Sequence, residues 1–465
     1  MRSHNRIRRA LLLLAAVCCL IPALLTHTRA PLQAEAAGNL PDAAYQVRVG
    51  VAVPALGSGL YTADLRCGSG FTVGVSSGGG RNFEALFSLG NTALKVHTDS
   101  AGAVTLYDGE SGELLYTHTG ERPLALKGAN GHPITLHRSD RSREYPGFLE
   151  IQPEGGALRL VNVVDRETYV KCVMSTEIGG NASKETRKAF SVLIRTVPMT
   201  PKHTASGCDV CNTNCCQVYF GNYLRDAESD AIVDSTKGEY VTYQGIPIQC
   251  LYHGGNGGAS CSSVAAWGGD EVPYLTSVTL QENEDNPSEI WQYVFTKEEL
   301  FNFLSSRDAF QGLKDEVVSV KIKETDPYGS DYVTLLSVMD SNDNLFLVET
   351  SEKVRRALRF DSANFKVSYT MEANVVDGNG TVSAQTVAGY IDENGEYRSF
   401  DSFEEYPLAG TDAAVSADHI TFDGVGSGHG VGFSAVGAEQ LVGEGYSYRY
   451  LIEFYFNGTN ISKLP

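Results

Sequence analysis

Four cysteines lie within nine residues of this chain, and their spacing strongly constrains the local fold. Cys208 and Cys211 have the C-x2-C spacing with which a tight turn presents two thiolates to one metal ion. The cluster predicts a structural zinc site formed by Cys211, Cys215 and Cys216 with either Cys208 or His203. Because adjacent residues do not easily serve one tetrahedron, Cys215 or Cys216 would then be free or bridged elsewhere. One or two disulfides are the alternative.

A glutamate lies near the start of a helical stretch that is predicted to begin at residues 169–174. Glu177 is flanked by apolar Val173, Met174 and Ile178, so we expect it to be partly removed from water. Burial raises the pKa of a carboxyl group, which can then donate a proton to the leaving oxygen of a glycoside near neutral pH. From these residues alone, a solvated glutamate at a helix end is the simpler interpretation.

Two glycine-rich segments follow, at residues 247–258 and 426–434. Such turns expose backbone N–H groups that can bind sugar hydroxyls or N-acetyl groups. Trp267 could stack on a pyranose ring, and His429 could hydrogen-bond the sugar or orient Glu177. A tight turn with a core tryptophan, and a structural histidine, are the alternatives. The second segment lacks the lysine of a phosphate-binding loop, so nucleotide binding is not expected.

Taken together and in this order, these segments resemble the stage II sporulation protein D family (SpoIID/LytB), whose members act on peptidoglycan. The resemblance runs from about residue 158 to residue 459. It implies that Glu177 is the catalytic acid of a lytic transglycosylase. It also implies zinc ligands in the cysteine cluster, where the family has a His-Cys pair in place of Cys215-Cys216. The substrate-binding residues that it suggests are Tyr169, Arg195, His253, Trp267, His429 and Ser434.

The resemblance gives a leading hypothesis and two alternatives. The leading hypothesis is cleavage of the bond between N-acetylmuramic acid and N-acetylglucosamine in glycan strands without stem peptides, leaving 1,6-anhydro ends, in sporulation or wall remodelling. The first alternative is a non-catalytic, wall-binding enhancer of an N-acetylmuramoyl-L-alanine amidase. It is favoured by departures from the family pattern, notably Ala435-Val436 in place of Gln-Trp. The second is a zinc-braced surface protein. The expected partners are peptidoglycan strands, a cell-wall amidase and sporulation membrane proteins.

Composition and charge limit the class of protein. The chain has 465 residues, of which 42% are hydrophobic and 20% charged, as in globular proteins of two or three domains. Its formal charge of −19 argues against a nucleic-acid partner, because phosphate contacts need lysine and arginine.

The beginning of the chain has the pattern of a targeting segment. Residues 1–37 carry a basic start, an apolar run and small residues, which predicts a signal peptide or a signal anchor. The rest of the chain is then expected outside the cytoplasm, exported or anchored.

The predicted fold class is α+β. We expect a β-rich region at residues 38–150 and a catalytic domain at residues 151–465, with an α+β insertion at residues 295–370. Within these regions, hydrophobic periodicity predicts a helix at Lys184–Thr196 capped by Ser183. Turn signals predict a hairpin around Gln244-Gly245.

Overall fold

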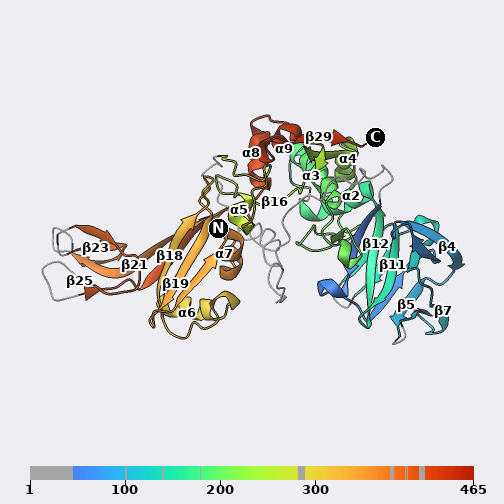
Figure 1. Cartoon of the computed structure of the whole chain (residues 1–465), viewed down its shortest axis with the longest axis horizontal. Helices are drawn as coiled ribbons and strands as arrows, with labels where there is room; N and C mark the ends of the chain where they lie inside the picture. Colours follow the sequence, from blue (N-terminus) through green and yellow to red (C-terminus); the bar gives the residue numbers. More distant parts are fainter. Residues whose placement is uncertain are drawn as a thin grey trace.

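The computed structural model describes residues 46–464, apart from residues 100–101, 139–140, 179, 281–288, 377–381, 393, 395 and 408–413. It is an α+β protein, as the sequence predicts. Two β-rich lobes lie on either side of a region that carries most of the helices (Figure 1). The expected targeting segment, residues 1–37, lies outside the described residues. Among those described, no helix has both the length and the apolar character needed to cross a membrane.

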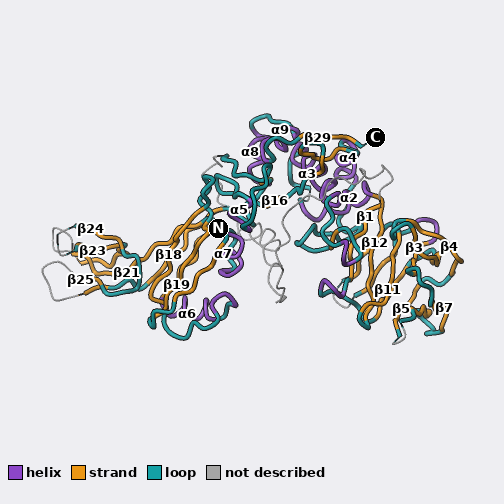
Figure 2. The backbone as a smooth tube through the Cα atoms, viewed as in Figure 1, coloured by secondary structure: helices purple, strands orange, loops and turns teal. Residues whose placement is uncertain are grey.

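The N-terminal lobe consists of two sheets, drawn on the right of Figure 2. The larger sheet has seven strands in the order β13 (Val210–Cys211), β1 (Gln46–Ala52), β12 (Ala157–Asp165), β11 (Phe148–Glu154), β8 (Leu124–Gly128), β3 (Phe71–Ser77) and β4 (Asn82–Leu89). The smaller sheet has six strands in the order β10 (Ser142–Tyr145), β9 (Ile134–His137), β2 (Thr62–Arg66), β5 (Ala93–Thr98), β6 (Val104–Asp108) and β7 (Leu114–His118).

Alternating apolar residues explain how these two sheets pack. Leu65, Val96 and Leu106 of the smaller sheet and Leu126 and Leu160 of the larger one are fully buried in one core. The sheet also corrects the expected domain boundary at residue 151. That residue falls inside β11, and β12 continues the same sheet, so the β-rich lobe extends to the start of the first helix.

The helical region follows β12 directly. Its helices are α2 (Arg166–Glu177), α3 (Lys184–Thr196), α4 (Ala227–Ser235), α5 (Ser263–Trp267), α8 (Ala435–Gly443) and α9 (Tyr448–Tyr455). Short strands join them, namely β14 (Glu239–Tyr243), β15 (Ile246–Pro247), β16 (Tyr252–His253), β28 (Phe433–Ser434) and β29 (Asn460–Lys463). The predicted bounds of α3 are confirmed, and Ser183 caps it by accepting a hydrogen bond from Thr186 N at 3.3 Å.

The predicted hairpin is also confirmed. β14 and β15 pair antiparallel, and Gln244 and Gly245 between them both have positive φ, at 52° and 81°. Two positive φ values at a two-residue turn are what a type I′ hairpin requires.

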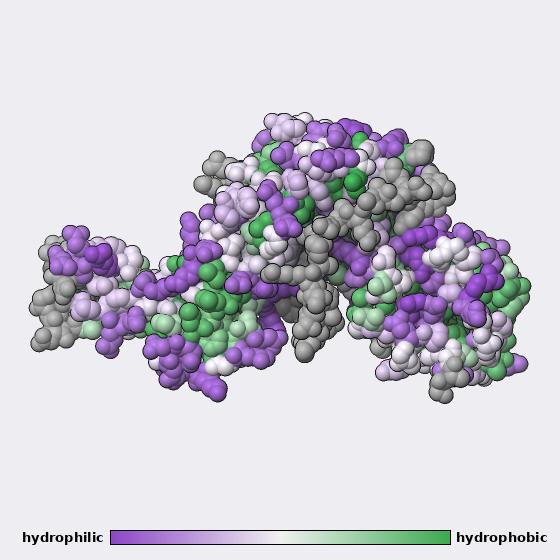
Figure 3. Space-filling model, viewed as in Figure 1, coloured by the Kyte–Doolittle hydropathy of each residue, from purple (hydrophilic) through white to green (hydrophobic). Residues whose placement is uncertain are grey.

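The second lobe is the insertion, and it is wider than the predicted residues 295–370. Its outermost strands, β17 (Ile290–Thr296) and β27 (His419–Val425), pair antiparallel and close the unit. Apolar side chains gather on the face that carries β18 and β19 (Figure 3). The other elements are α6 (Lys297–Ser305), β18 (Val317–Thr325), β19 (Val333–Asp340), β20 (Leu345–Glu349), α7 (Ser351–Leu358), β21 (Phe365–Val376), β22 (Val382–Val387), β23 (Gly389–Ile391), β24 (Tyr397–Ser399), β25 (Tyr406–Pro407) and β26 (Ala414–Val415).

Candidate functional site

Glu177 is the last residue of α2, which corrects the expectation that it lies near the start of a helix. The helix begins at Arg166 because Asp165 caps it, accepting a hydrogen bond from Thr168 N at 3.0 Å. Val170 and Val173 are fully buried and hold one face of α2 in the core. The capped start and the buried face together fix where Glu177 lies.

Three hydrogen bonds join the last turn of α2 to its neighbours, two to Val218 and one to Tyr252 of β16. Val218 N donates to Glu177 Oε1 at 2.5 Å, and the Tyr252 hydroxyl hydrogen-bonds the same carboxyl group. In return, the Thr176 hydroxyl donates to the Val218 carbonyl at 2.5 Å. The carboxyl group of Glu177 is therefore oriented from two sides.

The pKa of Glu177 is raised above its ordinary value of 4.5. The main cause is burial, which removes water from the charged form. The hydrogen bonds from Val218 N and Tyr252 stabilise the carboxylate and oppose the rise. Because burial dominates, the group retains its proton to higher pH than an exposed glutamate does, as a general acid requires.

A chain of hydrogen bonds leads from the core to Glu177. The Tyr169 hydroxyl donates to Gln217 Oε1 at 2.6 Å, and Gln217 Nε2 donates to the Tyr252 hydroxyl at 3.3 Å. Tyr252 completes the chain at the carboxyl group. Tyr169 is fully buried and stacks on Tyr219. Its position therefore supports the site from beneath rather than offering a surface to a glycan.

The cysteine cluster is brought together just before this segment. One ligand atom each from His203, Cys211, Cys215 and Cys216 lies within 4.8 Å of the others. Both adjacent cysteines belong to this group, so the expectation that one of them is free or bridged elsewhere is corrected. A turn at residues 213–216, with Cys216 N bonded to the Thr213 carbonyl, brings both thiols to one place.

Cys208 lies apart from this group. It is buried in a small apolar cluster with Val53, Phe148 and Val161. Of the two candidates for the fourth ligand, the structure places His203, and not Cys208, beside the other three cysteines. Each of the eight described cysteines is a free thiol.

The donor set fits zinc. Three thiols and one imidazole are the ligands of a tetrahedral structural site. The thiols of Cys211 and Cys215 raise the pKa of His203 to about 9, and hydrogen bonds from the other thiols lower the pKa of Cys211. Cys211 is thereby shifted toward the thiolate, the form that binds a metal, whereas His203 and Cys216, whose pKa values are raised by the neighbouring thiols, would release protons when the ion binds.

The cysteine loop is anchored to the N-terminal lobe. β13, which ends at Cys211, pairs in parallel with β1. Asp209 accepts hydrogen bonds from Arg81 at 2.8 and 3.0 Å, and Arg48 donates to the Gly207 carbonyl at 2.7 Å. Arg48 is itself held by a buried ion pair with Glu150 at 2.7 Å. The β-rich lobe thus sets the position of the loop that reaches Glu177.

A second group of aromatic residues lies on the other side of β16. Successive side chains of a strand point to opposite faces, so His253 points away from the side on which Tyr252 meets Glu177. The His253 ring lies 5.7 Å from that of His429, which lies 5.4 Å from that of Trp267. Burial lowers the pKa values to about 3 for His253 and about 4 for His429, so both rings are neutral at pH 7. Trp267 is 39% exposed.

The segment that carries Glu177 and the cysteine cluster matches a known protein family. Residues 154–243, which contain Glu177 and all four clustered ligands, match the model of the SpoIID family, described as stage II sporulation protein. This match, together with the relatives described next, supports the assignment of the chain to the SpoIID family and a function related to the cell wall.

Two similar proteins extend the comparison with this chain. It is 26% identical over 308 residues to an amidase enhancer of Bacillus subtilis (strain 168), covering 63% of this chain and 40% of the relative. It is 27% identical over 325 residues to an uncharacterized protein of Brachyspira hyodysenteriae (strain ATCC 49526 / WA1), covering 68% of this chain and 72% of the relative. The chain thus spans less than half the length of the Bacillus relative.

Two of the expected substrate-binding residues occupy buried, structural positions. Arg195 is fully buried, pairs with Glu167 at 2.8 Å and donates to the Glu239 carbonyl at 2.9 Å. Ser434 is fully buried and caps α8, accepting a hydrogen bond from Gly437 N at 3.1 Å. Neither side chain reaches a surface where a glycan would bind, so we do not propose either as a ligand contact.

Three residues that contact Glu177 or its partners were not assigned from the sequence. They are Gln217, Val218 and Tyr252. Gln217 and Val218 directly follow the cysteine cluster, and Tyr252 precedes His253. The signal was therefore adjacency to residues already singled out, but only the fold brings these positions to one carboxyl group.

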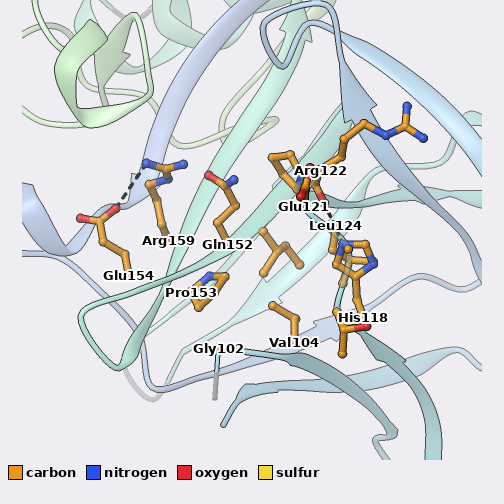
Figure 4. A pocket seen from close by; sticks show the side chains of 14 residues that line it. Gly102, Val104, His118, Glu121, Arg122, Leu124, Gln152, Pro153, Glu154 and Arg159 are labelled. Atoms are coloured by element: carbon orange, nitrogen blue, oxygen red, sulfur yellow. Dashed lines mark hydrogen bonds and ion pairs between the residues drawn. The ribbon is translucent and has the colours of Figure 1, made fainter. Parts of the chain in front are cut away.

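A cavity of about 290 Å³ lies in the N-terminal lobe (Figure 4). Its lining includes His118 and Gln152 and the ion pair between Arg159 and Glu154. None of the residues expected to act in catalysis or metal binding lines it, and it plays no part in the proposal below.

Proposed function

We propose that this protein is a lytic transglycosylase that acts on peptidoglycan glycan strands outside the cytoplasm. The observation that carries the proposal is the environment of Glu177, a carboxyl group whose pKa is raised by burial and which is oriented by Val218 N and the Tyr252 hydroxyl. Such a group can donate a proton to a glycosidic oxygen near neutral pH.

The reaction needs one carboxyl group. Glu177 protonates the oxygen that links N-acetylmuramic acid to N-acetylglucosamine, and the bond from that oxygen to C1 breaks. The Glu177 carboxylate then takes the proton of the C6 hydroxyl as the O6–C1 bond forms and closes a 1,6-anhydro ring. Because the nucleophile belongs to the substrate, the second carboxylate of ordinary glycosidases is not required.

Zinc has a bracing role in this proposal. His203, Cys211, Cys215 and Cys216 would hold it, and four protein ligands leave no open position for water activation. Cys216 is followed by Gln217 and Val218, which bond Tyr252 and Glu177. A fixed Cys216 therefore keeps these two donors in place.

The direct test is digestion of purified glycan strands whose stem peptides have been removed. Mass spectrometry is expected to find 1,6-anhydromuramic ends after incubation with the protein. Reducing ends in their place would contradict the transglycosylase and indicate hydrolysis.

A second candidate function is enhancement of a cell-wall amidase. It is favoured by the name of the Bacillus subtilis relative and by Ala435-Val436, which begin α8 where the family commonly has Gln-Trp. The two candidate functions can be distinguished by adding the protein to an amidase that acts on intact peptidoglycan. Faster release of stem peptides, without any anhydro ends, would favour the enhancer.

The pH dependence of cleavage should follow Glu177. A general acid works only when protonated, so kcat/KM is expected to be high below the raised pKa and to fall as the pH rises through it. Tyr252→Phe removes a hydrogen bond that lowers this pKa. We therefore expect the falling limb of the profile of kcat/KM against pH to move to higher pH. Tyr450→Phe, at an exposed position of α9, is the control. A limb that moves to lower pH in Tyr252→Phe would contradict this assignment.

A further inference from the structure

An arginine of the N-terminal lobe packs against two aromatic rings beside the Glu177 helix. Arg143 of β10 places its guanidinium carbon 3.9 Å from the ring centre of Tyr223 and 4.8 Å from that of Phe220. Both distances are within the range of cation–π contacts. We call these three residues, Arg143, Phe220 and Tyr223, the stacking platform.

The stacking platform is tied to the catalytic helix. The Ser175 hydroxyl, two residues before Glu177, donates to the Tyr223 carbonyl at 3.0 Å. On the other side, Asn222 N donates to the Glu144 carbonyl of β10 at 2.8 Å. The segment that carries Phe220 and Tyr223 therefore joins β10 to the last turn of α2.

The platform offers two kinds of binding group at the surface. Tyr223 is 43% exposed, and an exposed aromatic face suits the apolar face of a pyranose ring. The Tyr223 ring lies against the Arg143 guanidinium, and the Phe220 ring, inclined at 69° to the Tyr223 ring, flanks the same group. The N–H donors of a guanidinium lie in its own plane, at the edge. One edge donor, Nη1, bonds the Ser142 carbonyl at 3.3 Å. An arginine held in this way is preorganised for a carboxylate.

The local charge is opposite to that of the whole chain. The protein has a formal charge of −19. Yet Arg138, Arg141 and Arg143 all lie close enough to Tyr145 to oppose the rise in its pKa that burial causes. Residues 138–144 carry these three arginines as well as Asp140 and Glu144, which gives the stretch a small net positive charge that favours an anionic ligand.

We propose that the stacking platform is a glycan subsite that recognises a muramic acid residue free of its stem peptide. A sugar ring stacks on Tyr223, and Arg143 pairs with the carboxylate of the lactyl group. This rests on the proposed function, because it assigns a specificity subsite to the same glycan strand. A stem peptide converts that carboxylate into an amide, so the pairing selects stripped strands.

The experiment measures binding to the Glu177→Gln protein, which would not consume the ligand. The probes are a muramic-containing oligosaccharide with free lactyl carboxylates and a chitin oligosaccharide of equal length, which has none. When Arg143→Gln is introduced into the Glu177→Gln protein, we expect the affinity for the muramic probe to fall about tenfold or more. The affinity for the chitin probe should stay unchanged. Tyr223→Ala is expected to weaken both. Arg122→Gln, at an exposed arginine paired with Glu84, is the charge control.

A second measurement does not depend on an arginine variant. The preference of the Glu177→Gln protein for the muramic probe should shrink as salt is added, because salt screens the ion pair. Equal affinity for the two probes at low salt would overturn the subsite. So would an undiminished preference after Arg143→Gln.

The outcomes for the subsite and for the proposed function are separable. If the unmodified protein forms no anhydro ends but the preference for the muramic probe requires Arg143, the subsite stands and the transglycosylase falls. If anhydro ends form but Arg143→Gln leaves the preference intact, the transglycosylase stands and the subsite falls.

Discussion

Replacing Glu177 with glutamine is expected to lower the rate of anhydro-end formation by about 10²–10⁴-fold, the usual contribution of a general acid. Glutamine has nearly the same shape, and its amide oxygen can still accept the hydrogen bond from Val218 N. It cannot supply a proton at the glycosidic oxygen. The loss should therefore appear in kcat, measured by mass spectrometry of the products, with little change in glycan affinity.

Glu453→Gln is the matched control for this variant. Glu453 is exposed on α9, so the same loss of charge there should leave the rate unchanged. A Glu177→Gln protein that cleaves at the unmodified rate would remove the basis for assigning Glu177 as the acid.

Replacing Cys211 with serine is expected to abolish stoichiometric zinc binding. Loss of one thiolate from a four-ligand site leaves the metal without its tetrahedral set. Elemental analysis should find one zinc per unmodified chain and none per Cys211→Ser chain. Cys208→Ala is the control, because Cys208 lies in the apolar cluster with Val53 and Phe148 and should leave the stoichiometry at one.

The same variant should lose stability. Structural zinc binding contributes to the folding free energy, and a loss of about 3 kcal/mol would lower the Tm by roughly 6–12 °C for a domain of 150–250 residues. Because Cys216 leads directly to Val218, we also expect slower cleavage. If the unmodified protein contains no zinc and its mass lacks two hydrogens per cysteine pair, disulfides replace the metal site.

Local patterns were sufficient to predict individual elements. The apolar periodicity and Ser183 gave the bounds of α3, and Gln244-Gly245 gave the hairpin. Thr296 and Glu299 likewise form a capping box at the start of α6. Such signals depend on neighbours in sequence, so one sequence is enough to read them.

Contacts between segments that are distant in the chain could not be predicted from the sequence. Spacing alone left His203 and Cys208 equally suited to a fourth ligand, and only the pairing of β13 with β1 places them differently. The resemblance suggested Arg195 as a substrate contact, but Arg195 is buried against Glu167 and the Glu239 carbonyl, and no periodicity in the sequence reveals that packing. The partners of Glu177 were missed for the same reason.

The position of β1 at the start of the described chain has a consequence for synthesis. Val47 pairs with Val164, and Val49 with Val210, more than about a hundred residues later. At the usual elongation rate, β1 waits roughly 6–23 s for β12 to be made. Its apolar residues have no partner strand during that time, so the timing of elongation, as well as the final contacts, governs whether the sheet assembles before the nascent chain aggregates.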